Sequence, residues 1–195
     1  MDLHGKHVIL GSASPRRREL LSGLGMDFEV DTRNNFVESF AEGTPHVEVP
    51  ALMSRGKSHG FWRPLAEGEI LLTSDTMVLL DKLIMGKPHS RPEAEEMLWR
   101  LSGRTHEVIS AVTARDLMHE ETLTDTTLVT FRELSGAEID YYIDSCRPFD
   151  KAGAYGIQEW IGYAACTGIE GSFYNVMGFP VHKVYSLLTK FAEYD

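Results

Sequence analysis

Hydroxyl residues and a basic cluster follow an apolar run near the start of the chain. The run Val8–Leu10 leads through Ser12 and Ser14 to Pro15 and the three arginines at 16–18. A serine before a proline is typical of a helix start, with Ser14 as the N-cap and Pro15 as the first helical residue. Backbone N–H groups, hydroxyls and guanidinium groups at one helix start suit a phosphate group. The stretch therefore indicates an anion site between a buried strand and a helix.

The arginine triplet at 16–18 has two interpretations. A Walker A loop, which ends in Gly-Lys-Ser/Thr, and a Gly-x-Gly-x-x-Gly dinucleotide fingerprint are both missing, so neither motif explains the cluster. The arginines either bind phosphate or form an ordinary solvated helix face. Their place at a helix start favours phosphate binding.

A carboxylate stands at the end of a second apolar run. Asp75 and Thr76 follow the run 70–74, which we expect to be a buried strand that ends at these two residues. Asp75 would then reach a cleft, where a carboxylate can deprotonate an attacking water. It could equally cap a turn.

Other polar residues stand out by their positions in expected loops or on a helix. They are Glu38, Lys57, Lys87, Asp150, Lys151 and Gln158. Each also has a structural interpretation: Lys87 as a solvated hairpin lysine, and Gln158 as a residue that satisfies loop backbone groups. Carboxylates beside a phosphate site repel the ligand unless a divalent cation lies between them. Acidic and basic groups in one pocket would therefore indicate metal-assisted phosphoryl chemistry.

Strands and helices that would position these residues follow from the hydrophobic pattern. Short apolar or β-branched runs predict strands at 8–10, 28–30, 70–74, 77–80, 83–85, 106–114, 123–131 and 163–166, with a turn at 168–172. Helical spacing predicts helices from Pro15, over about 47–61, over 92–102, over about 135–143, and from about 181 to 191. The two long runs, 106–114 and 123–131, are expected to form an antiparallel pair.

Composition limits the classes of protein to which the chain can belong. The 195 residues are 43% hydrophobic and 25% charged, which is typical of one compact globular domain. A net charge of −10 argues against a nucleic-acid or anionic-membrane surface. No segment approaches the roughly 18 apolar residues of a membrane span, and no signal peptide is evident, so we expect a cytoplasmic protein with both cysteines reduced.

Five motifs in order and spacing resemble the Maf family over nearly the whole chain. They are Ser12-Ala13-Ser14-Pro15-Arg16-Arg17, Ser74-Asp75-Thr76, Gly86-Lys87-Pro88, Leu101-Ser102-Gly103-x-Thr105-His106-x-Val108 and the stretch from Asp150 to Gln158. The resemblance implies an α/β fold over 1–195, with an elongated mixed central sheet, flanking helices and two lobes around a deep cleft. It also implies a homodimer that hydrolyses nucleoside triphosphates to the monophosphate and pyrophosphate. The implied purpose is the removal of unwanted nucleotides, including modified pyrimidine nucleotides, from the cellular pool.

The resemblance also implies roles for single residues. Phosphate binding falls to Ser12, Ser14, Arg16, Arg17, Lys57 and Lys87. Asp75 would be the proton acceptor, and Glu38 would help it to bind Mg²⁺ or Mn²⁺. The chain departs from the family pattern at three places. The family usually has two adjacent acids around Glu38, but here Val37 precedes it and Ser39 follows. Gly56 stands where a larger helix former is usual, and Glu159-Trp160 follows Gln158 where a small residue is common.

Substrate preference is implied by three positions. Arg16, Thr76 and Gln158 match the branch of the family that prefers dTTP and UTP. A related branch acts on 7-methyl-GTP and is the alternative enzyme. A nucleotide-binding regulator of septum formation is the alternative of another class, and retention of the carboxylates and basic groups favours the enzyme.

Overall fold

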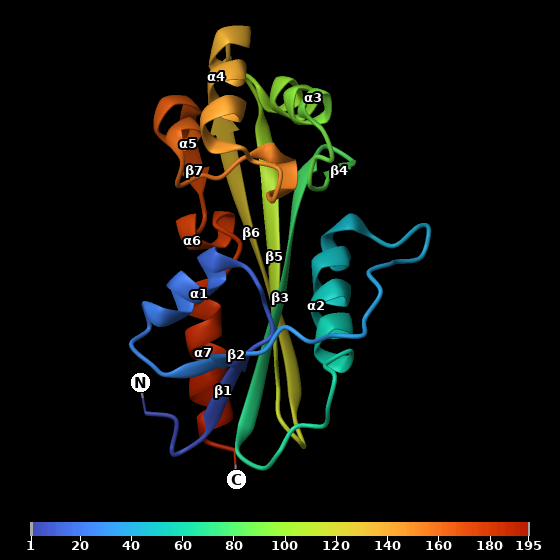
Figure 1. Ribbon diagram of the computed structural model, residues 1–195, viewed down its shortest axis with the longest axis vertical. Coiled ribbons are helices and arrows are strands. Elements are labelled where there is room, and N and C mark those ends of the chain that lie inside the picture. The colour runs from blue at the N-terminus through green and yellow to red at the C-terminus, as the bar shows by residue number, and fades with distance from the viewer. Residues whose placement is uncertain (1, 195) are drawn as a thin grey trace. The chain divides into compact units, whose positions relative to one another are not determined.

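The computed structural model describes residues 2–194 and contains alternating strands and helices (Figure 1). The strands are β1 (His7–Leu10), β2 (Phe28–Val30), β3 (Glu69–Leu80), β4 (Leu83–Met85), β5 (Thr105–Arg115), β6 (Glu120–Phe131) and β7 (Cys166–Glu170). The α-helices are α1 (Pro15–Ser22), α2 (Val49–His59), α3 (Arg91–Leu101), α4 (Gly136–Cys146), α5 (Trp160–Ala165), α6 (Phe173–Val176) and α7 (Val181–Ala192). Short 3-10 helices are η1 (His46–Glu48) and η2 (Ala152–Ala154). Within residues 2–194, no helix is long and apolar enough to cross a membrane.

The seven strands of the described chain form one mixed sheet. Its order is β2-β1-β3-β5-β6-β7, and β4 pairs with β3. β1 pairs in parallel with both β2 and β3, whereas β4 and β7 pair antiparallel with β3 and β6. The mixed α/β class, with a central sheet flanked by helices, is therefore confirmed.

The chain separates into two compact units. The first contains the chain up to Asp75, the segment Ser110–Asp125 and the chain from Gly178 onward. The second contains Thr76–Ile109 and Thr126–Met177. The long strands β3, β5 and β6 each contribute residues to both units.

The core of the first unit is built on two parallel strands. Residues 8–10 of β1 and 70–72 of β3 are all fully buried. Continuous apolar runs of this kind are typical of parallel strands that are covered on both faces. α7 buries Val184, Leu187 and Leu188, whose spacing makes one apolar helix face.

Two helices of the second unit begin with a capping serine. Ser90 caps α3, and Ser135 with Glu138 forms a capping box at α4. In that box the N–H of Glu138 donates to Ser135 Oγ, and the N–H of Ser135 donates to Glu138 Oε2 at 2.8 Å. Cys146 and Cys166 form no disulfide, as expected.

Two expectations about strands are wrong. β3 does not end at Asp75 but continues to Leu80, because Met77 and the three residues after it are buried and keep the strand apolar. The expected strand at 163–166 is the helix α5, and β7 begins only at Cys166 and occupies part of the expected turn at 168–172. Periodicity cannot separate a strand from a helix in so short an apolar run.

Candidate active site

The N-terminus of α1 forms as the sequence predicts. Ser14 is the N-cap, its Oγ accepts a hydrogen bond from the backbone N–H of Arg17 at 3.5 Å, and a proline lies in the first helical turn. The backbone N–H of Ser14 donates to Oγ of Ser12 at 3.3 Å. The two hydroxyl groups therefore order the turn between β1 and α1.

The Arg17 side chain extends from α1 to the middle of β3, where its guanidinium group is hydrogen-bonded. Its Nη1 donates to Ser12 Oγ at 3.2 Å and to the backbone oxygen of Ser74 at 2.8 Å, and its Nε donates to the backbone oxygen of Gly178 at 3.0 Å. Burial lowers the pKa of Arg17 to about 10, and the nearby Asp75 carboxylate opposes this shift. The guanidinium is therefore a fixed cation at neutral pH close to Asp75.

Buried hydroxyl groups attach α2 to the sheet. Ser54 Oγ donates to the backbone oxygen of Thr73 at 3.1 Å, and Thr73 Oγ1 donates to the backbone oxygen of Ser54 at 2.8 Å. Ser54 also shares a hydrogen bond of 2.8 Å with Thr113 on β5. Residues three apart on a helix, and two apart on a strand, lie on one face. Lys57 and Asp75 therefore face each other because Ser54 and Thr73 do.

Lys57 joins two carboxylates from different segments. Its Nζ lies 2.6 Å from Asp75 Oδ1 and 2.8 Å from Glu38 Oε1. The side chains of Lys57 and Asp75 are 22% and 20% exposed, whereas that of Glu38 is 62% exposed. The pair of Lys57 with Asp75 is thus held within the protein, and Glu38 approaches it from the solvent side.

The first unit brings together most of the residues that the sequence singled out there. Those linked by contacts are Ser12, Ser14, Arg17, Glu38, Lys57 and Asp75. Arg16 is half-buried at the start of α1, and its charge is one of the causes that lower the pKa of Arg17. Thr76, the next residue along β3 after Asp75, is also half-buried and is the first residue of the second unit.

The remaining two predicted residues belong to the second unit. Lys87 is exposed just after β4. Gln158 follows η2, and its side-chain Oε1 is buried with no hydrogen-bond partner among the described residues. A buried acceptor of this kind needs a donor, and a bound ligand can supply one.

The sequence singles out Lys151 by its place in the loop before Gln158, but it does not predict the contacts that Lys151 and its neighbours make there. Lys151 Nζ lies 2.9 Å from Glu159 Oε1, and the hydroxyl of Tyr142 donates to the other oxygen of that carboxylate. The N–H of Gly156 donates to the Tyr142 hydroxyl at 2.9 Å. A Cβ built at Gly156 would lie 2.9 Å from Gln158 Nε2, so glycine lets these side chains close around the loop. The glycine-rich composition of the loop indicates an irregular binding element, and it does not reveal which side chains pair within it.

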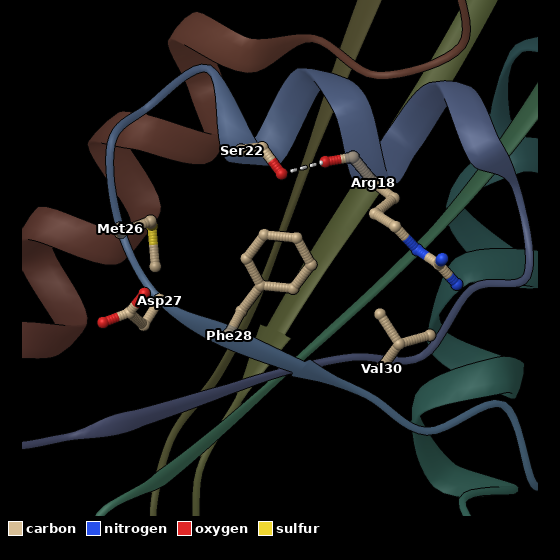
Figure 2. Close-up of a pocket in the computed structure, with 6 residues that line it drawn as sticks. All are labelled: Arg18, Ser22, Met26, Asp27, Phe28 and Val30. Atoms are coloured by element: carbon tan, nitrogen blue, oxygen red, sulfur yellow. Dashed lines mark hydrogen bonds between the residues drawn. The ribbon is translucent and has the colours of Figure 1, made fainter.

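A pocket between α1 and β2 lies apart from these contacts (Figure 2). It is open, has a volume of about 460 Å³, and is lined by Arg18, Ser22, Met26, Asp27, Phe28 and Val30. Figure 2 shows the Arg18 side chain extending past Val30. The predicted site residues do not line this pocket. The arginine triplet is thus divided between two surroundings, since Arg17 contacts β3 and Arg18 faces this pocket.

The carboxylates of Glu38 and Asp75 fit a hard divalent cation. Both contact the same cationic group, Lys57 Nζ, so their oxygens converge on one positive charge. Mg²⁺ commonly takes one or two protein carboxylates and completes its shell with water and substrate phosphates. Within the described chain, no group of three or more His, Cys, Asp or Glu side chains is placed to hold a metal ion.

The sequence is similar to known proteins over nearly its whole length. A family model described as Maf-like protein matches residues 7–191. The dTTP/UTP pyrophosphatase of Phocaeicola vulgatus is 46% identical over 183 residues, which make up 94% of this chain and 95% of that protein. Proteins of the same name from Porphyromonas gingivalis and Bacteroides thetaiotaomicron are 46% and 45% identical over 188 and 183 residues. These matches cover 95% and 94% of this chain, and 94% and 95% of the two relatives.

Proposed function

The chain belongs to the Maf family, and we propose that its nucleotide pyrophosphatase activity acts on dTTP and UTP. The observation that carries the proposal is the position of Lys57 Nζ between the carboxylates of Glu38 and Asp75, at 2.8 and 2.6 Å. Cations and carboxylates gathered in this way suit a triphosphate and an attacking water. The dTTP/UTP name of the relatives supports the pyrimidine preference.

In the proposed reaction, a water oxygen attacks the α-phosphorus of the nucleotide. A new bond forms between this oxygen and the phosphorus, and the bond from the phosphorus to the oxygen that bridges to the β-phosphate breaks. Pyrophosphate and the nucleoside monophosphate are the products. Asp75 aligns the water and accepts its proton on a carboxylate oxygen, and the contact with Lys57 keeps that carboxylate oriented.

The phosphate chain is held by cations and by the start of α1. Arg17 and Lys57 offset the negative charge that develops on the phosphate oxygens. Ser12, Ser14 and Arg16 bind the phosphates through hydroxyl and guanidinium groups, and Lys87 adds a further positive charge. Glu38 and Asp75 would hold Mg²⁺ or Mn²⁺, which when bound neutralises phosphate oxygens.

Base recognition is assigned to Gln158 and Thr76. An amide side chain offers one acceptor and one donor group, which match the N–H and carbonyl groups on the edge of uracil or thymine. The buried Oε1 of Gln158, which has no partner among the described residues, supports this role. The Thr76 hydroxyl can donate or accept and completes the proposed contact. The family resemblance further supports a homodimer, and light scattering on the purified protein tests this oligomeric state.

The test is pyrophosphate release from a panel of nucleotides. The wild-type protein with Mg²⁺ or Mn²⁺ is expected to hydrolyse dTTP and UTP faster than CTP, GTP and 7-methyl-GTP. Asp75→Asn should lower kcat by about 100-fold or more, because removal of a general base costs roughly 10²–10⁴ in rate. Undiminished turnover by a folded Asp75→Asn protein would defeat the catalytic assignment. Preferred hydrolysis of 7-methyl-GTP would defeat the pyrimidine assignment.

A further inference from the structure

The loop that carries Glu38 is packed onto α2 by one aromatic side chain. A Cβ built at Gly56 would lie 2.2 Å from Cζ of Phe36, and one built at Gly60 would lie 2.6 Å from Cβ of Phe36. Non-bonded carbon atoms need about 3.5 Å or more. The two glycines, spaced four residues apart, therefore make a surface with no side chain on which Phe36 lies.

Hydrogen bonds attach the same loop to the C-terminal end of α2. Nδ2 of Asn34 donates to the backbone oxygen of Lys57 at 2.6 Å, and the N–H of Phe36 donates to Asn34 Oδ1 at 2.8 Å. The N–H of Asn35 donates to the backbone oxygen of Gly60 at 2.8 Å. Helix C-termini leave backbone carbonyl groups without hydrogen-bond partners. This loop supplies donors to two such carbonyl groups, those of Lys57 and Gly60. The helical residue that Asn34 contacts is Lys57 itself.

Glu38 follows this attachment by two residues. Its neighbour Val37 is 79% exposed, and Phe40 further along the loop is 48% exposed. We propose that Asn34 and Phe36 are positioning residues that hold Glu38 against Lys57. Phe36 does so by packing on the surface formed by Gly56 and Gly60. The consequence for catalysis rests on the proposed function, in which Glu38 binds the divalent cation.

Gly56 itself argues for this interpretation. Glycine is one of the least favourable residues in a helix interior, and Gly56 lies within α2. A larger residue there would strengthen the helix but would occupy the place of the Phe36 ring. The helix therefore carries a glycine at the position where the loop needs room.

Carbodiimide cross-linking measures this positioning directly. A water-soluble carbodiimide joins a carboxylate to a contacting amine as an amide, so Lys57 should yield one product with Glu38 and one with Asp75. Digestion and mass spectrometry give the ratio of the two products. The product with Asp75 reports that α2 is in place on β3, and the product with Glu38 reports that the loop is in place on α2.

Two substitutions of opposite kind, one that removes the Phe36 ring and one that fills its place, should both lower the ratio of the Glu38 product to the Asp75 product. Phe36→Ala removes the ring, and Gly56→Ala fills the space that the ring occupies while favouring the helix. Each should lower the ratio of the Glu38 product to the Asp75 product by about threefold or more, since the population of the attached loop falls with its lost contacts. Phe36→Leu, which keeps an apolar side chain on the glycines, should retain most of the ratio.

Phe40→Ala is the matched control, because it removes an exposed aromatic ring from the same loop. An unchanged ratio in both Phe36→Ala and Gly56→Ala would overturn the proposal, and so would an equal fall in Phe40→Ala. Phe36→Ala and Gly56→Ala should each need an Mn²⁺ concentration about threefold or more above that of the wild type for half-saturation. The electron paramagnetic resonance signal of free Mn²⁺ measures this concentration. If the wild-type protein hydrolyses no nucleotide, the proposed function fails, and the cross-link ratio still decides the positioning.

Discussion

Ser54 and Thr73 are joined by two hydrogen bonds in opposite directions. Each side-chain hydroxyl donates to the other residue's backbone oxygen, at 3.1 and 2.8 Å, and both residues are fully buried. The register that this pair sets between α2 and β3 is what places Lys57 opposite Asp75, three residues along the helix and two along the strand. A polar contact inside the core therefore determines the geometry of the charged groups.

Ser54→Ala is predicted to destabilise the protein and to lower its activity. The substitution leaves buried oxygens at Thr73 and Thr113 with one donor or acceptor fewer, which costs about 1–3 kcal/mol of unfolding free energy. Urea denaturation measures this loss. Ser186→Ala is the control, because Ser186 is exposed on α7 and bonds only one turn back to His182. Equal stability of the two variants would contradict the role of Ser54.

Lys57→Met is predicted to lower kcat/KM for dTTP by about 100-fold, because removal of one charge-stabilising donor typically costs 10²–10³ in rate. Methionine keeps the length of the side chain but leaves Asp75 and Glu38 without their shared cation. The measurement is steady-state pyrophosphate release. Lys82→Met is the matched control, since Lys82 is exposed in the turn between β3 and β4. A similar loss in both variants would mean that net charge, and not the position of Lys57, is responsible.

Much of this site follows from local sequence rules. The Ser14 N-cap and the proline after it predict the start of α1, and an apolar run predicts the strand that delivers Asp75. These features depend on neighbours in the sequence, which periodicity and capping preferences describe. The family resemblance then assigns the roles, which geometry alone does not distinguish from a structural ion pair.

Other features depend on contacts between distant segments and could not be predicted in this way. The contact of Phe36 with Gly56 joins a loop to a helix twenty residues further on, and in the sequence Gly56 is simply a poor helix former. The short helix α5 was expected to be a strand, because six residues are too few to show a period. The ion pair of Glu159 with Lys151 is likewise visible only once the loop is folded.

The stability of the protein is predicted to fall on acidification below pH 6.5 because of His106. Burial lowers the pKa of His106 to about 4 from its ordinary value of 6.5. The unfolded chain therefore binds a proton over this range while the folded protein does not, so the unfolding free energy falls as pH drops from 6.5 and levels off below 4. The full loss is roughly 3 kcal/mol, since each pKa unit corresponds to about 1.4 kcal/mol.

His106→Gln isolates this contribution, because an amide can keep the hydrogen bond to the Tyr155 hydroxyl but does not titrate. Denaturation at pH 6.5 and pH 4.5 should show a smaller loss in the variant than in the wild type. Glu138, whose pKa is lowered from 4.5 to about 2 by its bond to Arg132, begins to lose its contribution near pH 4.5, and this loss is the same in both proteins and cancels in the comparison. Identical pH profiles for the two proteins would contradict the assignment to His106.

Gln158→Ala is predicted to weaken discrimination among bases more than hydrolysis itself. The variant loses the buried acceptor at Oε1 and the amide donor, which would contact the base, whereas the proposed catalytic groups at Asp75 and Lys57 are unchanged. The ratio of kcat/KM for UTP to that for CTP should fall by about tenfold, which corresponds to the loss of roughly 1.4 kcal/mol of selective binding. Steady-state kinetics with each nucleotide separately measures this ratio. If the rates for every base fall by the same factor, Gln158 supports the site without reading the base.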